Sequence, residues 1–245
     1  MIRLSARLRT AAAAVMLTAA ATGTAVAVAG PANADNESCT TRTVVTVNSK
    51  AANQRLVYGT YANVTAKVTA SCPTGDPDFA DAGTLVLQKS LNGGSTWRTV
   101  QTRSSANGQI PDYASVYGKY AISRNTVFRA VYSGSTNRSA SAWSDTFTAS
   151  SDSISVHVYR HVGDRHTCAR KGCTYTFTIK PAASIRGLTV KFQRVVGGKW
   201  RTRSHVRVSS NGTFRHLFTL GKTRILIPGG RGYLGSTGSV RVYRY

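Results

Sequence analysis

Apolar and polar side chains alternate with a period of two residues in several segments of this 245-residue chain. The pattern is clearest in CTYTFTI, residues 173–179, where Tyr, Phe and Ile share one face and three Thr share the other. The segments 43–47 and 61–70 are also rich in Val and Thr. Such segments, bounded by Gly, Asn and Ser turns, are typical of half-buried strands. No sustained helical period follows the N-terminal segment, so the sequence predicts an all-β protein.

One pattern of residues occurs twice. GTLVLQKSLNGGSTWRTVQTRSSANG (83–108) aligns with GLTVKFQRVVGGKWRTRSHVRVSSNG (187–212). Each copy has an apolar strand ending in Gln, a Gly-Gly turn, Trp-Arg-Thr and a later Asn-Gly. Trp97 and Trp200 are 103 residues apart, a spacing that indicates a duplicated domain rather than a short repeat.

The pattern YG-x-YANVTAKV, AGTLVLQKSLNGGSTWRTVQT, ANG, VFRAVYSG and SAWS resembles the bacterial Ig-like repeats of secreted and cell-surface proteins. The second unit is more divergent and keeps Gln193, Trp200, Asn211-Gly212 and Tyr233. The resemblance implies two tandem Ig-like antiparallel β-sandwich domains, over 35–150 and 151–245. Such domains resemble spacers and binding modules, and the fold does not choose between these roles.

The N-terminal segment has the features of a secretory signal peptide. A basic start is followed by an alanine-rich apolar run and by Ala32-Asn33-Ala34, a small-x-small cleavage site. We therefore expect residues 1–34 to be removed, leaving 211 residues that are secreted. The alternative is an uncleaved membrane anchor, which the small residues disfavour. No later apolar run is long enough for a transmembrane span.

Four cysteines in an exported chain predict two disulfides, and three connectivities are open. The resemblance to Ig-like domains selects one of them. In such a sandwich the first two strands are antiparallel neighbours, so the start of one lies near the end of the next. This topology implies the pairs Cys39–Cys72 and Cys168–Cys173.

The segment HVYRHVGDRHTCARKGC (157–173) contains typical zinc ligands, but its pattern favours a strand. Ile154, Val156 and Val158 are predicted to face the core, with Val162 continuing their parity. His157 and His161 then lie on the other face about 13 Å apart, too far to share one zinc ion. His166, Cys168 and Cys173 remain possible ligands, yet export favours the disulfide. We expect no metal and no cofactor.

Positive charge is concentrated in the C-terminal half. Residues 35–150 have 11 Lys and Arg against 7 Asp and Glu, a net charge of +4, whereas residues 151–245 have 18 against 2, a net charge of +16. In KWRTRSHVRVSS (199–210), strict alternation places Trp200, Val206 and Val208 on one face. The cations of the opposite face are predicted to be Lys199, Arg201, Arg203, His205 and Arg207, joined by Lys191 and Arg241 from nearby strands.

This ladder of cations predicts contact with anionic extracellular or cell-envelope polymers, with charge holding the protein near the envelope. The alternatives are a solvated polar face, a protein partner and a purely structural spacer. A bulge near Trp97 and Val100 in the first unit would shift the register here if it recurs.

Other chemistry finds little support in the sequence. Asp76, Asp78 and Asp81 fit either a polar turn or a calcium site, although the glycine and distal glutamate of an EF-hand loop are missing. Glu37 is the one glutamate of the chain, and motifs of hydrolases, zinc proteases and phosphate loops do not occur. We therefore predict a protein that is not an enzyme.

Overall fold

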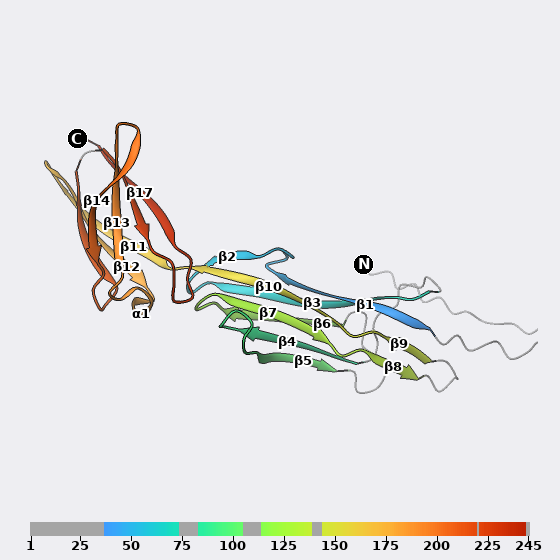
Figure 1. The fold of residues 1–245 in the computed structure, drawn as a ribbon. Helices are drawn as coiled ribbons and strands as arrows, with labels where there is room; N and C mark the ends of the chain where they lie inside the picture. Colours follow the sequence, from blue (N-terminus) through green and yellow to red (C-terminus); the bar gives the residue numbers. More distant parts are fainter. Residues whose placement is uncertain (1–36, 74–82, 105–113, 139–143, 220, 244–245) are drawn as a thin grey trace, which may run out of the picture. The chain divides into compact units, whose positions relative to one another are not determined.

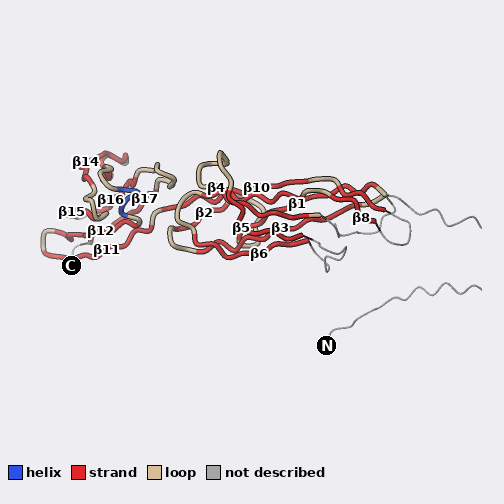
Figure 2. The backbone as a smooth tube through the Cα atoms, turned by 90° about the horizontal axis from the view of Figure 1, so that it is seen from below, coloured by secondary structure: helices blue, strands red, loops and turns tan. Residues whose placement is uncertain are grey.

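The computed structural model describes residues 37–73, 83–104, 114–138, 144–219 and 221–243. The regular secondary structure of these segments is β-strand, apart from the short helix α1 (Ala182–Ile185), and loops and turns connect the strands (Figure 2). The predicted all-β fold is confirmed, and the described strands form two β-sandwiches. The described residues include no helix long and apolar enough to cross a membrane. The predicted signal peptide lies outside the described residues, as do Asp76, Asp78 and Asp81.

The first sandwich consists of two five-stranded sheets (Figure 1). One sheet has the order β6 (Ala114–Ala121), β3 (Tyr61–Ser71), β1 (Ser38–Val47), β9 (Ser144–Phe147) and β8 (Ser135–Arg138). The other has the order β2 (Gln54–Val57), β10 (Ser150–Tyr159), β7 (Thr126–Tyr132), β4 (Thr84–Ser90) and β5 (Arg98–Ser104). Neighbouring strands are antiparallel except for the pairs β1–β9 and β2–β10, which are parallel.

The strand Ser150–Tyr159 belongs to the first sandwich, whereas the sequence predicts that it opens the second. It pairs with β7 from Ser150 opposite Tyr132 to Val156 opposite Thr126. Its Ile154, Val156 and Val158 are buried as predicted, but in the core of the first sandwich. Alternation identifies the buried face of a strand and not the sheet that it joins. Strand pairing therefore places the change of sandwich after Tyr159 rather than after Ser150.

The second sandwich packs a three-stranded sheet against a four-stranded sheet. The smaller sheet has the order β11 (His161–Ala169), β12 (Gly172–Lys180) and β15 (Thr213–Phe218). The larger has the order β14 (Lys199–Arg207), β13 (Thr189–Val196), β16 (Gly221–Ile227) and β17 (Ser236–Val242). Phe177 and Ile179 are buried as the alternation predicts. Val162 is 37% exposed, so its predicted core position is wrong; it lies on the edge strand β11, which has a neighbour on one side only.

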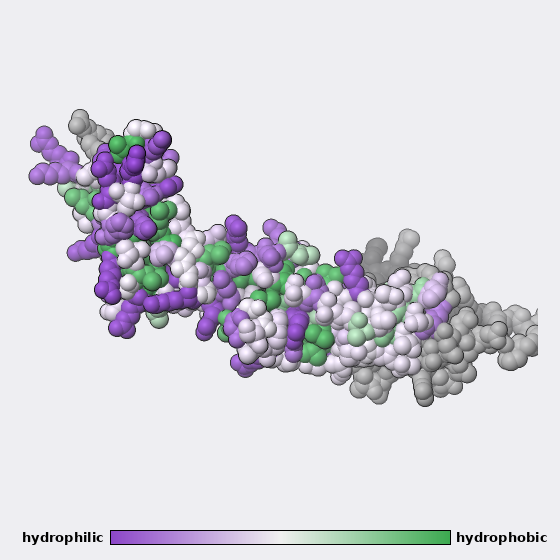
Figure 3. Space-filling view, in the orientation of Figure 1, coloured by the Kyte–Doolittle hydropathy of each residue, from purple (hydrophilic) through white to green (hydrophobic). Residues whose placement is uncertain are grey.

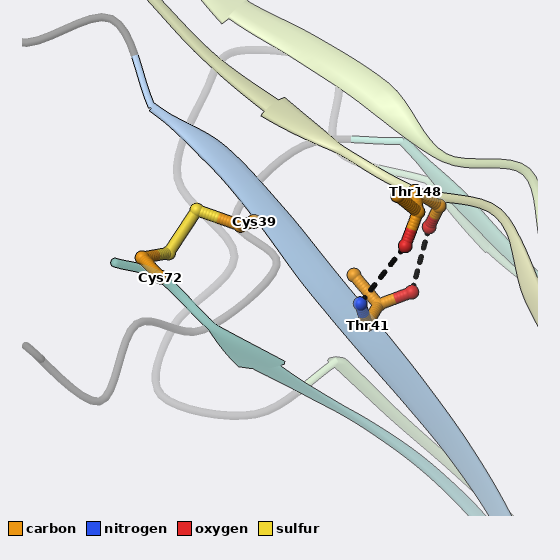
Figure 4. The surroundings of a disulfide bond; sticks show 4 residues. All are labelled: Cys39, Thr41, Cys72 and Thr148. Carbon is orange, nitrogen blue, oxygen red and sulfur yellow. Dashed lines mark hydrogen bonds between the residues drawn. A yellow bond between two sulfur atoms is a disulfide. The ribbon is translucent and has the colours of Figure 1, made fainter. Parts of the chain in front are cut away.

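Both predicted disulfides are confirmed. Cys39 and Cys72 join the start of β1 to the end of β3, next to the pair Thr40 and Ser71 (Figure 4). Cys168 and Cys173 are opposite each other at the end of the β11–β12 hairpin. In both cases the topology of antiparallel neighbours brings the two cysteines together.

Arg160 follows β10 and precedes β11, where the chain passes from one sandwich to the other. Its side chain is buried, and its guanidinium carbon lies 4.8 Å from the ring centroid of Tyr233. Tyr233 packs in the first core, and its hydroxyl donates a hydrogen bond to the Ser123 carbonyl. Arg160 thus contacts Tyr233, a side chain of the hydrophobic core of the first sandwich. The residues next to Arg160 in the sequence do not indicate this contact.

Candidate functional site

The candidate site lies on β14 and its neighbouring strands. All seven predicted residues are exposed: Lys191, Lys199, Arg201, Arg203, His205, Arg207 and Arg241. Lys191 lies opposite His205, and Thr189 lies opposite Arg207. Residues directly opposite in an antiparallel pair project on the same side of the sheet. Lys191, His205 and Arg207 therefore share the outer face of the larger sheet.

A β-bulge divides the predicted ladder. Phe192 pairs with Ser204 but Gln193 pairs with Thr202, so Arg203 is the extra residue. An extra residue inverts the alternation beyond it. Trp200 therefore moves to the outer face, while Lys199 and Arg201 move to the opposite side. The prediction that five cations of this strand share one face is therefore wrong. The prediction that Trp200 and Val206 share a face is wrong for the same reason.

Two strands distant in sequence complete the outer face. Gln193 pairs with Arg224, and Lys222 pairs with Arg241, which carries the face across β16 to β17. We call this surface the cationic face, and its residues are Lys191, His205, Arg207, Lys222, Arg224 and Arg241. Its four strands contain no Asp or Glu. Figure 3 shows hydrophilic side chains gathered over the second sandwich.

The sequence analysis missed Lys222 and Arg224. Their signal is the alternation in GKTRILI (221–227), where two cations flank an inward Thr223. The pairing of this strand with β13 is not visible in the sequence. Arg241, which was predicted, lies with its guanidinium carbon 5.2 Å from the ring centroid of Tyr243.

Arg224 is held in place by its neighbours. Its Nε donates to Gln193 Oε1 at 2.6 Å, and its guanidinium carbon lies 4.6 Å from the centroid of the Trp200 ring. Gln193 Nε2 donates to Thr202 Oγ1 at 3.0 Å. The side chains thus form a continuous network over the bulge.

The first sandwich has a matching network at a matching bulge, between Leu87 and Gln88. There Arg129 Nη2 donates to Gln88 Oε1 at 2.6 Å, and the Arg129 guanidinium carbon lies 4.0 Å from the Trp97 ring centroid. Gln88 Nε2 contacts Thr99 Oγ1 at 3.4 Å. Because the same arrangement occurs in the less basic half of the chain, we interpret the Gln-Trp-Arg network as a structural feature of the bulge. Arg224 is therefore a poor choice for testing binding.

On the inner side of the same bulge lies a cavity of about 580 Å³ between the two sheets. Arg203 and Ser204 line it from the bulge, and Arg194 lines it from β13. His216 lines it from β15, with its ring stacked on that of Phe192 at a centroid distance of 3.7 Å. Arg203 thus belongs with this cavity and not with the cationic face.

The stability of the protein should depend on pH through His216. Burial lowers the pKa of His216 from its ordinary value of 6.5, because desolvation disfavours the imidazolium. At pH values between the pKa of His216 in the folded protein and its pKa in the unfolded chain, the unfolded chain binds more protons. The contribution of His216 to the free energy of unfolding is therefore complete above pH 6.5 and declines as the pH falls below it. Urea denaturation at pH 7.5 and pH 5.5 should show a smaller loss of stability for His216→Phe than for the parent. Equal losses would contradict this assignment.

The histidine-rich segment crosses from one sandwich to the other. His157 lies on β10 and His161 on β11. His166 stacks on Tyr175 at a centroid distance of 4.7 Å. Cys168 and Cys173 are bonded to each other, so neither offers a thiolate to a metal. Among the described residues, the one group of potential metal ligands close together is Glu37 with Cys39 and Cys72, and these cysteines form the other disulfide.

No known protein family matches the sequence, and no characterised relative does. Among solved structures, a segment of two fibronectin type III domains from chicken tenascin is 10% identical, covers 84% of this chain and 99% of that chain, and has a TM-score of 0.39. Native alpha-2-macroglobulin from E. coli is 11% identical, covers 81% of this chain and 16% of that chain, and has a TM-score of 0.28. A second structure of that protein, spanning domains NIE-MG1, is 8% identical and has a TM-score of 0.22. It covers 84% of this chain and 97% of that chain. At these values the similarities carry no functional inference.

Proposed function

We propose that this protein is a secreted, non-catalytic binding protein whose second sandwich contacts an anionic polymer of the extracellular space or the cell envelope. The contact surface is the cationic face. The observation that carries the proposal is that three cations, Lys191, Lys222 and Arg241, come from strands paired side by side, with no acidic residue on the sheet. Two disulfides are typical of exported proteins and support the location.

The spacing of these cations suits a repeating anion. Neighbouring strands are about 4.8 Å apart, and alternate residues of one strand are about 6.8 Å apart. His205 and Arg207 follow one strand, and Lys191 lies opposite His205. Lys222 lies opposite Arg241, and this pair is offset by four residues along β16 from Leu226, the residue opposite Lys191. A polymer with a charge on every repeat can therefore engage several cations at once. Each exposed contact is weak, but release of counterions from several contacts gives appreciable affinity.

The test is a triple charge reversal, Lys191→Glu, Arg207→Glu and Arg241→Glu. Binding of the full chain to duplex DNA, teichoic acid and neutral dextran is measured by fluorescence anisotropy over a salt series. For DNA, the slope of log affinity against log salt should fall by about 1 for each contact removed, or about 3 in all. Dextran should not bind in either case.

The matched control is Arg165→Glu, Lys180→Glu and Arg186→Glu, which changes the net charge equally on exposed residues outside the cationic face. This control should retain most of the slope. Equal effects of the two triple variants would show that net charge acts without a defined face. Absence of polyanion binding by the parent at physiological salt would contradict the proposal and leave the role of a structural spacer or protein-binding module.

A further inference from the structure

The hairpin between β13 and β14 has an exposed apolar tip. Val196 lies opposite Lys199, so Gly197 and Gly198 form the whole turn. Both glycines have a positive φ, as a two-residue hairpin turn of type I′ requires. Val195 and Val196 precede the turn and are 39% and 42% exposed. Figure 1 shows this loop, in orange, projecting from the second sandwich.

The tip extends past the strands that support the rest of β13. Among the described residues, β13 pairs with β16 only as far as Arg194, so its last two residues have β14 as their one neighbouring strand. Apart from residues adjacent in sequence, no heavy atom lies within 4 Å of the position that a Cβ would take on Gly197 or Gly198. The tip therefore presents apolar surface that the fold does not fully bury.

The corresponding hairpin of the first sandwich has a polar tip. The second residue after the Gln shared by the two copies is Ser90 in the first and Val195 in the second. Ser90 is buried, and its Oγ accepts a hydrogen bond from Gly94 N at 2.9 Å. Asn92 Oδ1 accepts from Thr96 N at 2.9 Å, which fixes a longer loop. A hairpin in this position therefore does not require valines at its tip.

Basic and aromatic side chains flank the two valines. Lys199 and Arg201 follow the turn, and both are exposed. The bulge places them on the side of β14 away from the cationic face, which they share with Val196. Trp200 lies opposite Val195 on the other side. The hairpin contains no Asp or Glu. Apolar, aromatic and basic groups in this combination favour binding at an anionic membrane surface.

We propose that the tip of the β13–β14 hairpin inserts into an anionic lipid bilayer, where the two valines enter the acyl region and Lys199 and Arg201 contact lipid phosphates. Two valines are too small for a stable protein–protein interface, which buries about 1,200 Å² or more in total. A second copy of the chain is disfavoured, because two hairpins of the same charge repel each other. A bilayer supplies both an apolar interior and a negative surface. The tip is separate from the cationic face, so the proposal does not depend on polymer binding.

The probe is a vesicle of equal parts phosphatidylglycerol and phosphatidylcholine, and binding of the full chain is measured by sedimentation at physiological ionic strength. The double variant Val195→Thr with Val196→Thr keeps β-branched side chains of similar shape but removes apolar surface. Its vesicle affinity should fall by about fivefold to tenfold, with DNA binding unchanged. Leu91→Thr, in the corresponding hairpin and 41% exposed, is the matched control and should change vesicle affinity less than about twofold.

The basic residues of the tip are tested by Lys199→Gln with Arg201→Gln. Each cation near an anionic membrane surface contributes about fivefold in affinity, so this variant should bind the same vesicles about 25-fold more weakly. Lys180→Gln with Arg186→Gln removes the same charge from exposed residues outside the hairpin and should cost about threefold or less.

Trp200 reports insertion directly, because it lies opposite Val195. Phospholipids brominated on their acyl chains should quench the tryptophan fluorescence of the parent, and Trp200→Phe should remove most of this quenching. The proposal is overturned if the parent does not bind the vesicles, if the double threonine variant binds them as tightly as the parent, or if the quenching survives Trp200→Phe. Vesicle binding without binding of DNA or teichoic acid would contradict the cationic face alone.

Discussion

Replacement of Arg160 by methionine is expected to lower the free energy of unfolding by about 3 kcal/mol or more, because it removes a buried cation and leaves its acceptors unpaired. Arg160 is 3% exposed. Its Nε donates to Ser184 Oγ at 2.8 Å, and its Nη1 donates to the Pro228 carbonyl at 2.7 Å. Its Nη2 donates to the carbonyls of Ser184 at 3.0 Å and Gly230 at 2.9 Å.

These acceptors explain how a cation is tolerated in this position. Burial lowers the pKa of the Arg160 guanidinium, because desolvation disfavours the charge. Three carbonyls and one hydroxyl replace the lost water. The guanidinium also packs against the Tyr233 ring. Methionine fills a similar volume but donates no hydrogen bonds, so Ser184, Pro228 and Gly230 lose partners that water does not easily replace.

Urea denaturation of the full chain measures this effect. Arg231→Met is the matched control, since Arg231 Nη1 also donates to carbonyls near α1, those of Ala183 at 3.1 Å and Arg186 at 3.3 Å, but is exposed. The control should cost less than about 1 kcal/mol, as is usual for exposed polar contacts. Similar losses for both variants would contradict a special role for Arg160.

Removal of the Cys39–Cys72 disulfide should be the second large perturbation. The double variant Cys39→Ala with Cys72→Ala opens a loop with a sequence separation of 33, and the loop-entropy relation gives a loss of about 4 kcal/mol. Cys168→Ala with Cys173→Ala opens a separation of 5 and should cost about 2 kcal/mol. Denaturation without reductant compares the two variants with the parent.

The first disulfide also lies in a tightly bonded region. Thr41, two residues after Cys39, donates from its backbone N to Thr148 Oγ1 at 3.0 Å and from its Oγ1 to the Thr148 carbonyl at 2.6 Å (Figure 4). Cys39 itself is completely buried. Replacement of Cys39 by alanine therefore leaves a cavity, which lowers the free energy of unfolding in addition to the loss of loop entropy. If the short-loop variant proved as destabilising as the long-loop variant, loop length would not be the controlling factor.

The strands could be predicted from the sequence because alternation is a short-range pattern, whereas the pairing of the cysteines followed from the strand order that the resemblance to Ig-like domains implies. The alternation in residues 173–179 places Phe177 and Ile179 in the core, and the order of strands pairs Cys39 with Cys72. The cationic face was accessible only in part. Lys191, His205, Arg207 and Arg241 were predicted, whereas Lys222 and Arg224 required the pairing of β16 with β13 and β17.

Local alternation reports which side of a strand is apolar, because that property belongs to consecutive residues. It contains no information about which distant strand will pair with that segment, where one extra residue enters a ladder, or which carbonyls surround a side chain. Those features arise from hydrogen bonds between segments far apart in the chain. They explain why Ser150–Tyr159 joined the first sandwich, why Arg203 turned from the ladder to the cavity, and why Arg160 is buried.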